Sequence, residues 1–241
     1  MKWIIVTGDS KGLGKEIVNQ ILSETDYGVI GLSRSSEESV QDLVEKYPNK
    51  FKHISYDLED VSDIKILYTQ QIRKLGPIYG LVSNSALAYD DIVSNLNIDS
   101  LESMFKVNVF SAMHLTKYAI RDMLLNKIQG SIIYVSSVSA HTGYKGLSMY
   151  ASTKGALESF SKNVAREWGS KGIRSNCVVP GFMETSMSAS LTDEQKDRIY
   201  KRTSLKKETD VKSVASTVLY LLSDKSRSIT GTVIHVDNGT I

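Results

Sequence analysis

Apolar runs and helical patterns alternate along the whole chain, and this alternation is the sequence feature that most constrains the fold. The apolar runs are short and continuous, as in Trp3-Ile4-Ile5-Val6, and polar residues do not alternate within them. Continuous apolar strands are typical of a parallel sheet that is covered by helices on both faces. We predict strands at residues 3–6, 28–32, 52–56, 80–82, 131–135, 174–179 and 232–236, and helices at 15–22, 38–46, 64–75, 150–168, 211–222 and within 101–125.

Repeated strand–helix units connect in a right-handed sense, so this order predicts an α/β fold. We expect a single Rossmann-type, doubly wound parallel sheet of about seven strands with helices on both faces. No linker, repeat or low-complexity segment divides the sequence, which predicts one domain over residues 1–241. The irregular segment 182–209 is rich in Met, Ser, Thr and Lys and is predicted to be a mobile lid over a pocket. Met183 and Met187 either give that lid an apolar surface or pack into a loop-covered core.

Composition excludes several classes of protein. The chain has 29 basic and 27 acidic residues and a formal net charge of +2, which gives no field that favours nucleic acid or a membrane surface. Cys177 is the only cysteine, so an intramolecular disulfide is impossible, and its apolar neighbours predict a buried core thiol. The run at residues 3–6 is too short for a signal peptide or a membrane helix, so we expect a soluble, cytoplasmic protein.

A glycine-rich turn follows the first predicted strand. Gly8, Gly12 and Gly14 lie in the segment from Thr7 to Gly14, which opens the first predicted helix. Glycines let the backbone approach a phosphate closely, and the helix N-terminus offers amide donors and the positive end of a dipole. Turns also need glycine for conformational reasons alone, but the position after the first strand favours a dinucleotide site. The spacing is G-x-x-x-G-x-G, not the G-x-G-x-x-G of the longer dehydrogenases.

The second predicted strand ends at Ser33-Arg34, about twenty residues beyond the glycine turn, where dinucleotide sites place the group that reads the adenosine ribose. An acidic residue there favours NAD, whereas a guanidinium grips a 2′-phosphate in bidentate fashion. Lys11 adds a second cation on the same side. Arg34 as a plain solvated loop residue is the alternative, but the pattern predicts NADP(H) over NAD.

Tyr150 and Lys154 lie four residues apart in a predicted helix, so both project from one face. A free tyrosine has a pKa of about 10. A neighbouring ammonium and a cationic nicotinamide stabilise the phenolate and are expected to lower that pKa. The pair alone is common on surface helices, but Ser137 lies at the end of the strand predicted at 131–135, where a parallel sheet presents its ligand-binding edge. These three residues are therefore a candidate catalytic set.

Together with the glycine motif and Asn108, this set resembles the short-chain dehydrogenase/reductase family. The resemblance covers the chain from Thr7 to the segment 229–237, and four motifs in order at the family's spacing are highly specific. Within the family the chain is most similar to the β-ketoacyl-acyl-carrier-protein reductases, on the segment 180–185 and the carboxyl-terminal strand. The resemblance implies an NADP(H)-dependent oxidoreductase that reduces a carbonyl to a secondary alcohol.

The resemblance also implies a role for each matched residue. Tyr150 would protonate the carbonyl oxygen, Ser137 would hydrogen-bond that oxygen, Lys154 would hold the nicotinamide ribose, and Asn108 would anchor a water in a proton relay. Ser139 and Tyr144 would line the substrate pocket with Ser137 and Tyr150. The cofactor-binding positions would be Gly8, Ser10, Lys11, Gly12, Leu13, Gly14, Ser33, Arg34, Asp57, Leu58, Asn84, Ser85, Ala86, Tyr150, Lys154, Pro180, Gly181, Met183 and Thr185.

The chain departs from the family pattern after the fourth strand. Ser83-Asn84-Ser85-Ala86 stands where Asn-Asn-Ala-Gly is usual, so Ala86 adds a methyl group near the cofactor and is expected to limit φ there. Ala140 also stands where glycine is frequent. Docking of acyl carrier protein would need basic residues beside the site, and Lys127 and Lys171 fit that expectation or are plain solvated charges.

Three functions remain open from the sequence. The first is reduction of a 3-oxoacyl thioester on acyl carrier protein, as in fatty acid biosynthesis, by a homotetramer or homodimer whose assembly is implied by analogy. The second is reduction or oxidation of another small ketone, sugar or polyol. The third, a non-enzymatic NADP(H) sensor, is disfavoured because a sensor needs no proton donor. We predict no metal site, since the histidines at 53, 114 and 235 lack ligands at metal-binding spacing, and no nucleic-acid or membrane partner.

Overall fold

The computed structural model describes residues 1–34, 38–185 and 192–240. In this described part, seven parallel strands form one sheet in the order β3-β2-β1-β4-β5-β6-β7. The order reverses between β1 and β4, and ligands of open α/β sheets bind outside the carboxyl ends of the strands at such a switch point. The predicted doubly wound sheet is confirmed. The strands are β1 (Trp3–Thr7), β2 (Gly28–Ser33), β3 (Phe51–Ser55), β4 (Ile78–Ser83), β5 (Ser131–Val135), β6 (Arg174–Pro180) and β7 (Val233–Val236).

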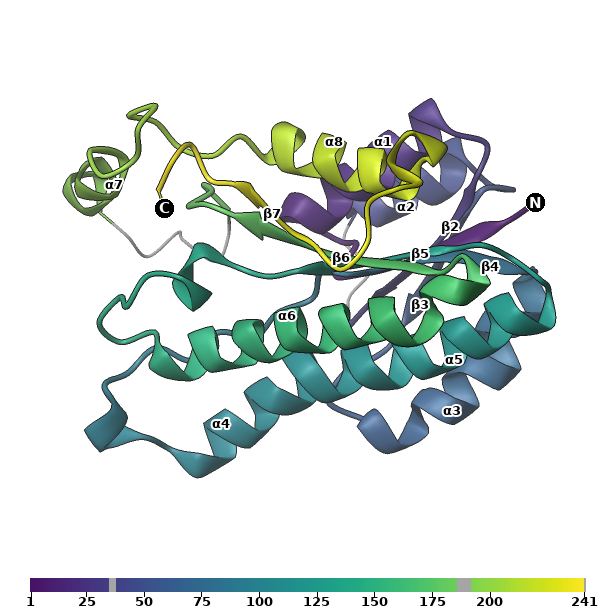
Figure 1. Ribbon diagram of the computed structural model, residues 1–241, viewed down its shortest axis with the longest axis horizontal. Coiled ribbons are helices and arrows are strands. Elements are labelled where there is room, and N and C mark those ends of the chain that lie inside the picture. The colour runs from purple at the N-terminus through teal and green to yellow at the C-terminus, as the bar shows by residue number, and fades with distance from the viewer. Residues whose placement is uncertain (35–37, 186–191, 241) are drawn as a thin grey trace.

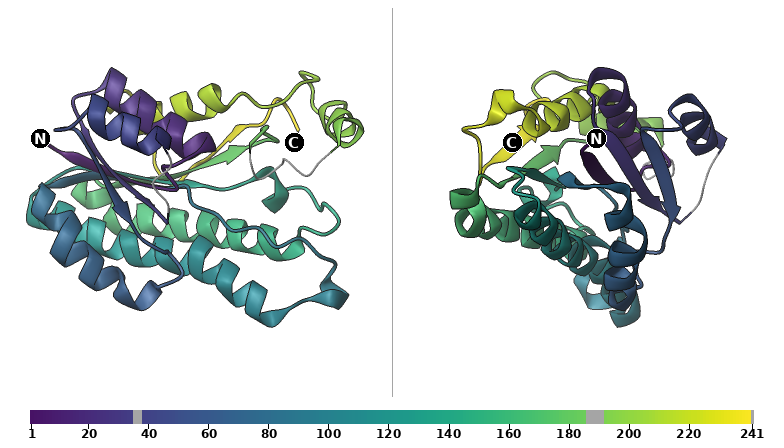
Figure 2. Two further views of the ribbon diagram at one scale, coloured as in Figure 1. Left: turned by 180° about the vertical axis from the view of Figure 1, so that it is seen from behind. Right: turned by 90° about the vertical axis from the view of Figure 1, so that its right-hand side faces the viewer.

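Helices cover both faces of the sheet (Figure 1). One layer holds α1 (Gly12–Glu24), α2 (Glu38–Lys46) and α8 (Val211–Leu222), and the other holds α3 (Ile64–Leu67), α4 (Ile98–Phe105), α5 (Ser111–Leu125) and α6 (Ser148–Trp168). Figure 2 shows the same three layers from behind and from one end. Strands β1, β4, β5 and β6 are buried along their whole length, as their continuous apolar sequences require.

Two predicted helices are interrupted. The helix predicted at 64–75 is α3 followed by a π-helical turn, η2 (Tyr68–Ile72), and a 3₁₀ turn, η3 (Arg73–Leu75). A second π-helical turn, η5 (Lys106–Phe110), separates α4 from α5 in the long helix predicted within 101–125. Such turns are frequent at functional sites, and η5 carries Asn108 into the protein interior, where it is 1% exposed.

The segment 182–209, predicted to be irregular, contains the helix α7 (Asp193–Tyr200). Its start is a capping box: the Thr192 hydroxyl accepts from the Gln195 amide, and the Gln195 side chain accepts from the Thr192 amide. Asp193 and Glu194 in the first turn also favour the positive end of the helix dipole. The T-x-x-Q pattern was readable in the sequence and was missed. Met187 lies outside the described residues.

Cys177 is fully buried on β6, and burial raises the pKa of its thiol to about 12. The predicted inert core thiol is therefore confirmed. Among the described residues, no helix is both long and apolar enough to cross a membrane. In the same parts of the chain, no cluster of three or more His, Cys, Asp or Glu side chains is arranged to hold a metal ion.

Candidate functional site

The carboxyl end of β5 and the start of α6 bring Ser137 and Tyr150 together. Ser137 follows β5 by two residues and caps a 3₁₀ turn, η6 (Val138–Ala140), where its hydroxyl oxygen accepts from the Ser139 amide at 3.2 Å. Because that bond uses a lone pair, the Ser137 proton remains available for donation. Tyr150 lies in the first turn of α6, close enough for the Ser137 hydroxyl to lower the pKa of its phenol.

Burial raises the pKa of Tyr150 to about 12, and the charge of Asp90 acts in the same direction. The hydrogen bond with Ser137 lowers that pKa but does not offset the desolvation. The expectation that protein groups lower this pKa is therefore wrong for the chain by itself, because a phenolate in this site loses more hydration than its neighbours return. At neutral pH the side chain is a neutral phenol, which is the form that can donate a proton.

Lys154 is buried one helical turn beyond Tyr150. Its ammonium nitrogen donates to the Val135 carbonyl at the end of β5 over 2.9 Å, and it lies 5.5 Å from the centre of the Tyr150 ring. The side chain is 1% exposed, and desolvation lowers its pKa to about 8. The predicted pair on one helix face is present, with the cation held against the same strand end that carries Ser137.

Asn108 closes the site from the π-helical turn. Its Oδ1 accepts from the Leu87 amide at 2.7 Å, while its Nδ2 donates to the Leu87 carbonyl at 2.9 Å and to the Thr153 hydroxyl at 3.0 Å. Both N–H groups of the amide are therefore used. A water held by Asn108 must bind the remaining Oδ1 lone pair or the backbone carbonyl.

The glycine turn has the shape of a phosphate cradle. Gly8 and Gly12 have φ values of +71° and +54°, which residues with a side chain rarely adopt. A Cβ atom on Gly14 would lie 1.9 Å from the Gly8 carbonyl oxygen, so this position also requires glycine. The N-cap of α1 is Lys11, whose side chain makes no cap hydrogen bond, and no acidic residue lies in the first turn. No carboxylate within the first helical turn competes for the amides at this helix end, so these residues fit a dinucleotide pyrophosphate.

Segments predicted to contact the cofactor meet at this turn. The Thr7 hydroxyl accepts from the amides of Asn84 and Ser85 at 3.0 and 2.9 Å, and Asn84 Nδ2 donates to the Thr7 carbonyl at 2.9 Å. Asn84 thus ties the end of β4 to the turn. The backbone of Ala86 has no positive φ, so alanine fits this position without backbone strain.

The adenine side of the groove is bounded by the ends of β2 and β3. The Arg34 side chain is 73% exposed, and its Nη1 lies 3.9 Å from Asp57 Oδ2, a long and solvent-screened ion pair. Asp57 Oδ1 accepts from the Glu59 amide, and Leu58 is buried beneath it. Arg34 is therefore placed beside the expected ribose position and is held only weakly. Lys11 is exposed on the glycine turn.

The remaining predicted residues lie at the same sheet edge. Gly181 donates from its amide to the Val236 carbonyl at 3.0 Å, which fixes the exit from β6, and the Thr185 methyl lies 3.7 Å from where a Cβ of Gly12 would be. Met183 packs against the core. Ser139 is 6% exposed, and its hydroxyl has no hydrogen-bond partner among the described residues. Tyr144 is partly buried in the loop before α6.

A buried hydrogen-bonded carboxylate–imidazole pair beneath the glycine turn was not predicted. Asp9, in the turn itself, is fully buried, and its Oδ2 lies 2.8 Å from Nδ1 of His53 on β3. A Cβ on Gly31 of β2 would lie 1.9 Å from the same oxygen, so only glycine leaves room for the carboxylate. Nothing in the spacing of positions 9, 31 and 53 showed that three neighbouring strand ends would bring them together.

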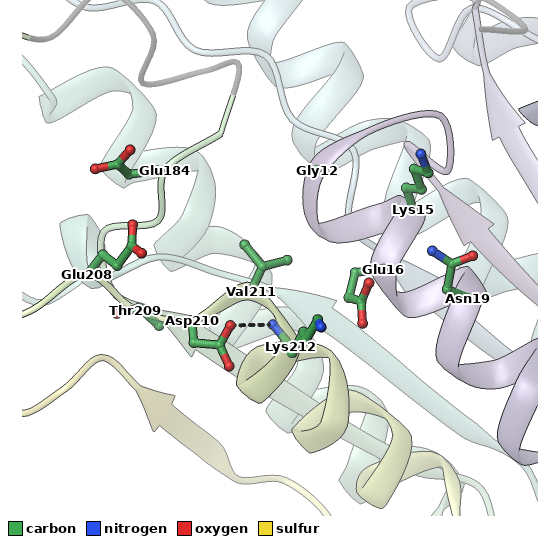
Figure 3. Close-up of a pocket in the computed structure, with 10 residues that line it drawn as sticks. All are labelled: Gly12, Lys15, Glu16, Asn19, Glu184, Glu208, Thr209, Asp210, Val211 and Lys212. Carbon is green, nitrogen blue, oxygen red and sulfur yellow. Dashed lines mark hydrogen bonds between the residues drawn. The ribbon is translucent and has the colours of Figure 1, made fainter. Parts of the chain in front are cut away.

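Two hollows open beside the site without containing its catalytic candidates. One, of about 530 Å³, lies behind Gly12, between α1 with Lys15 and Glu16 and the start of α8 (Figure 3). Four carboxylates and two lysine ammoniums line it, which disfavours a phosphate there. The second, of about 400 Å³, lies near Leu87 and Tyr89. The full lining of the first is Gly12, Lys15, Glu16, Asn19, Glu184, Glu208, Thr209, Asp210, Val211 and Lys212.

Lys127 and Lys171 do not lie beside this site. Lys127 follows α5 and precedes β5, and Lys171 follows α6 and precedes β6, so both are at the amino ends of the strands. Tyr150 is at the opposite end of α6, about 30 Å away at 1.5 Å per helical residue. The expected basic dock next to Tyr150 is therefore not formed by these two residues of the same chain.

Comparison with known proteins places the chain in a large group of enzymes. Residues 8–240 match a family model described as enoyl-(acyl carrier protein) reductase. The chain is 32% identical to 3-oxoacyl-(acyl-carrier-protein) reductase FabG of Haemophilus influenzae over 238 residues, which is 99% of this chain and 97% of the relative. It is 30% identical over 242 residues to the FabG protein of Staphylococcus aureus, with 99% and 97% coverage.

Solved structures share the architecture closely. A 4-hydroxyisoleucine dehydrogenase complexed with NADH has a TM-score of 0.93 at 25% identity and covers 100% of this chain and 98% of its own. A short-chain dehydrogenase from Burkholderia cenocepacia in complex with NADP has a TM-score of 0.90 at 25% identity, with 99% and 97% coverage. These proteins resemble the chain along its whole length.

Proposed function

Because the chain belongs to the short-chain dehydrogenase/reductase family, we propose that it is an oxidoreductase that reduces a carbonyl to a secondary alcohol with NADPH. The observation that carries this proposal is the placement of Ser137 beside the Tyr150 phenol, with the Lys154 ammonium one helical turn away and 5.5 Å from the centre of the Tyr150 ring. All three converge on the carboxyl edge of the sheet, where the glycine turn also lies.

When bound, the nicotinamide supplies hydride to the carbonyl carbon. Ser137 would donate its hydroxyl proton to the carbonyl oxygen and so stabilise the negative charge that develops there. Tyr150, which is a neutral phenol, protonates the same oxygen as general acid. The alcohol then leaves, and the phenol is restored from solvent.

Lys154 and Asn108 support these steps. The Lys154 ammonium would hold the nicotinamide ribose hydroxyls and stabilise the phenolate left after proton transfer, because opposite charges within about 4–6 Å favour the charged form. Asn108 would hold a relay water by its free lone pair. Ser139, with its buried and unpartnered hydroxyl, and Tyr144 would complete the substrate wall.

We assign NADP(H) in preference to NAD(H) on the basis of Arg34. Arg34→Asp is expected to lower the kcat/KM for NADPH by about tenfold to a hundredfold and to raise that for NADH, because a carboxylate repels the 2′-phosphate and accepts from a ribose hydroxyl. Steady-state kinetics with both dinucleotides measure this. The exposed Lys74→Asp on η3 is a matched charge reversal elsewhere on the surface. An unchanged ratio in Arg34→Asp would refute the assignment.

The substrate we favour is a 3-oxoacyl thioester on acyl carrier protein, as the names of the FabG relatives indicate for those proteins. NADPH consumption with acetoacetyl thioesters, free and carrier-bound, tests this against a panel of small ketones. Preference for the carrier-bound thioester supports the proposal. Preference for a small ketone would instead support the second candidate function, reduction or oxidation of a small ketone, sugar or polyol. The structural likeness to 4-hydroxyisoleucine dehydrogenase favours that candidate.

A set of finer proposals depends on the family resemblance. We propose a homotetramer or homodimer, a role in fatty acid biosynthesis, a cytoplasmic location, and one domain with a substrate lid around residues 182–209. Sedimentation analysis measures the first of these. If the wild-type protein oxidises NADPH with none of the ketones, the alternative of a non-enzymatic NADP(H) sensor would be favoured instead.

A further inference from the structure

A buried carboxylate lies one turn beyond Lys154 on the same face of α6. Glu158 is 7% exposed, and its Oε1 accepts from the Ser136 hydroxyl at 2.5 Å and lies 2.9 Å from His141 Nε2. Glu158 takes no direct part in the proposed hydride and proton transfers. Burying a carboxylate is costly unless hydrogen bonds compensate, so its retention here calls for a local reason.

The two partners of Glu158 flank the turn that carries Ser137. Ser136 precedes Ser137 directly, and His141 follows η6, whose backbone is closed by bonds from Ala140 to the Ser137 carbonyl and from His141 to the Val138 carbonyl. One carboxylate oxygen therefore holds both ends of residues 136–141 against α6. Since α6 also carries Tyr150, the same oxygen fixes the turn relative to the phenol.

Other groups pack against this clamp. The Ser136 amide donates to the Val178 carbonyl of β6 at 2.8 Å, and the Ser136 hydroxyl lies 3.5 Å from the Lys154 carbonyl. The His235 ring of β7 contacts the His141 ring edge-on, with ring centres 4.7 Å apart, and His235 Nδ1 lies 3.8 Å from Asp237 Oδ2. Among the described residues, His141 carries the only basic side chain within salt-bridge distance of the Glu158 carboxylate.

We propose that Glu158 is a positioning residue that holds the Ser137 hydroxyl beside the Tyr150 phenol by clamping Ser136 and His141. This inference rests on the proposed reductase function. Glu158 touches no reacting atom; it acts through Ser137. A displacement of the turn by about 1 Å is enough to weaken such a contact strongly.

Glu158→Leu, which removes both acceptor bonds, is expected to lower kcat for ketone reduction about tenfold while KM and the NADPH dissociation constant stay nearly unchanged. Glu158→Gln keeps an acceptor oxygen for Ser136 and should restore most of the activity. Glu167→Leu, an exposed glutamate in the last turn of the same helix, is the matched control and should have no effect. Ser136→Ala removes one bond with little change in volume and serves if Glu158→Leu does not fold.

The decisive measurement is a double-mutant cycle with Ser137→Ala. If Glu158 acts through Ser137, Glu158→Leu has no further effect on kcat once the Ser137 hydroxyl is gone. An equal loss of kcat in both backgrounds, or a loss that appears only in thermal stability, overturns the proposal.

Amide hydrogen exchange of residues 136–142 gives a readout that does not depend on activity. Faster exchange in Glu158→Leu than in Glu167→Leu is expected, and unchanged exchange contradicts the clamp. A wild-type protein that reduces no ketone would refute the proposed function and leave this exchange test standing, so the two failures are distinguishable.

Discussion

Tyr150→Phe is expected to lower kcat for carbonyl reduction about a thousandfold, because it removes the general acid and leaves the rest of the site in place. The variant lacks a single oxygen atom, and the dinucleotide cradle at the glycine turn does not involve it. The NADPH dissociation constant, measured by fluorescence titration, should therefore be nearly unchanged. Wild-type kcat for reduction should also be flat below about pH 7, since the pKa of Tyr150 is raised to about 12 and the phenol stays protonated, and should fall as Lys154, whose pKa is lowered to about 8, loses its proton.

Tyr220→Phe, on the exposed surface of α8, is the control for tyrosine substitution in general. If Tyr150→Phe retains near-normal turnover, another group supplies the proton and the assigned mechanism fails. If it loses NADPH binding as well, the ring contributes to the cofactor site and the kcat effect cannot be assigned to proton transfer alone.

The parts of the fold that depend on local pattern were predictable. The helix at 38–46, the strand at 131–135 and the helix at 211–222 have the predicted bounds, because apolar periodicity and flanking residues define them. The capping box at Thr192 carried the same kind of local signal for α7. The π-helical turn at Asn108 did not, because its amide is held by Leu87 and Thr153, which are distant in sequence.

The residue types that make up the site could be predicted from the sequence. The burial, contacts and pKa directions of those residues could not. The direction of the Tyr150 pKa depends on how deeply tertiary packing buries the ring, which no spacing reveals. In the sequence, Glu158 and Asp9 look like ordinary polar residues of a helix and a turn. Their roles arise only when β5 meets α6 and when β1, β2 and β3 align in the sheet.

Lys154→Met is expected to have opposite effects on activity and on stability. It should lower kcat at least a hundredfold, since the cation beside the phenol and the ribose is lost. It should also raise the free energy of unfolding at neutral pH by about 2 kcal/mol, or Tm by about 5 °C. The reason is that the folded protein lowers the pKa of Lys154 from 10.5 to about 8, which corresponds to about 3 kcal/mol of destabilisation at 1.36 kcal/mol per pH unit. The lost bond to Val135 offsets about 1 kcal/mol of this.

The pH dependence provides the specific test of that explanation. Between pH 8 and 10.5 the unfolded chain holds the Lys154 proton and the folded protein has released it, so the wild type gains stability as pH rises through this window. Lys154→Met has no such group, so its advantage of about 2 kcal/mol below pH 8 should shrink, pass through zero within this window, and become a deficit of about 1 kcal/mol above pH 10.5, where only the lost bond to Val135 remains. The raised pKa of Tyr150 affects stability only as pH approaches and exceeds the unfolded value of 10.0, so it leaves most of this window unaffected. Thermal unfolding of both proteins without added dinucleotide measures the curve, and a difference in Tm that is constant across the window would show that packing, not the desolvated ammonium, determines the effect.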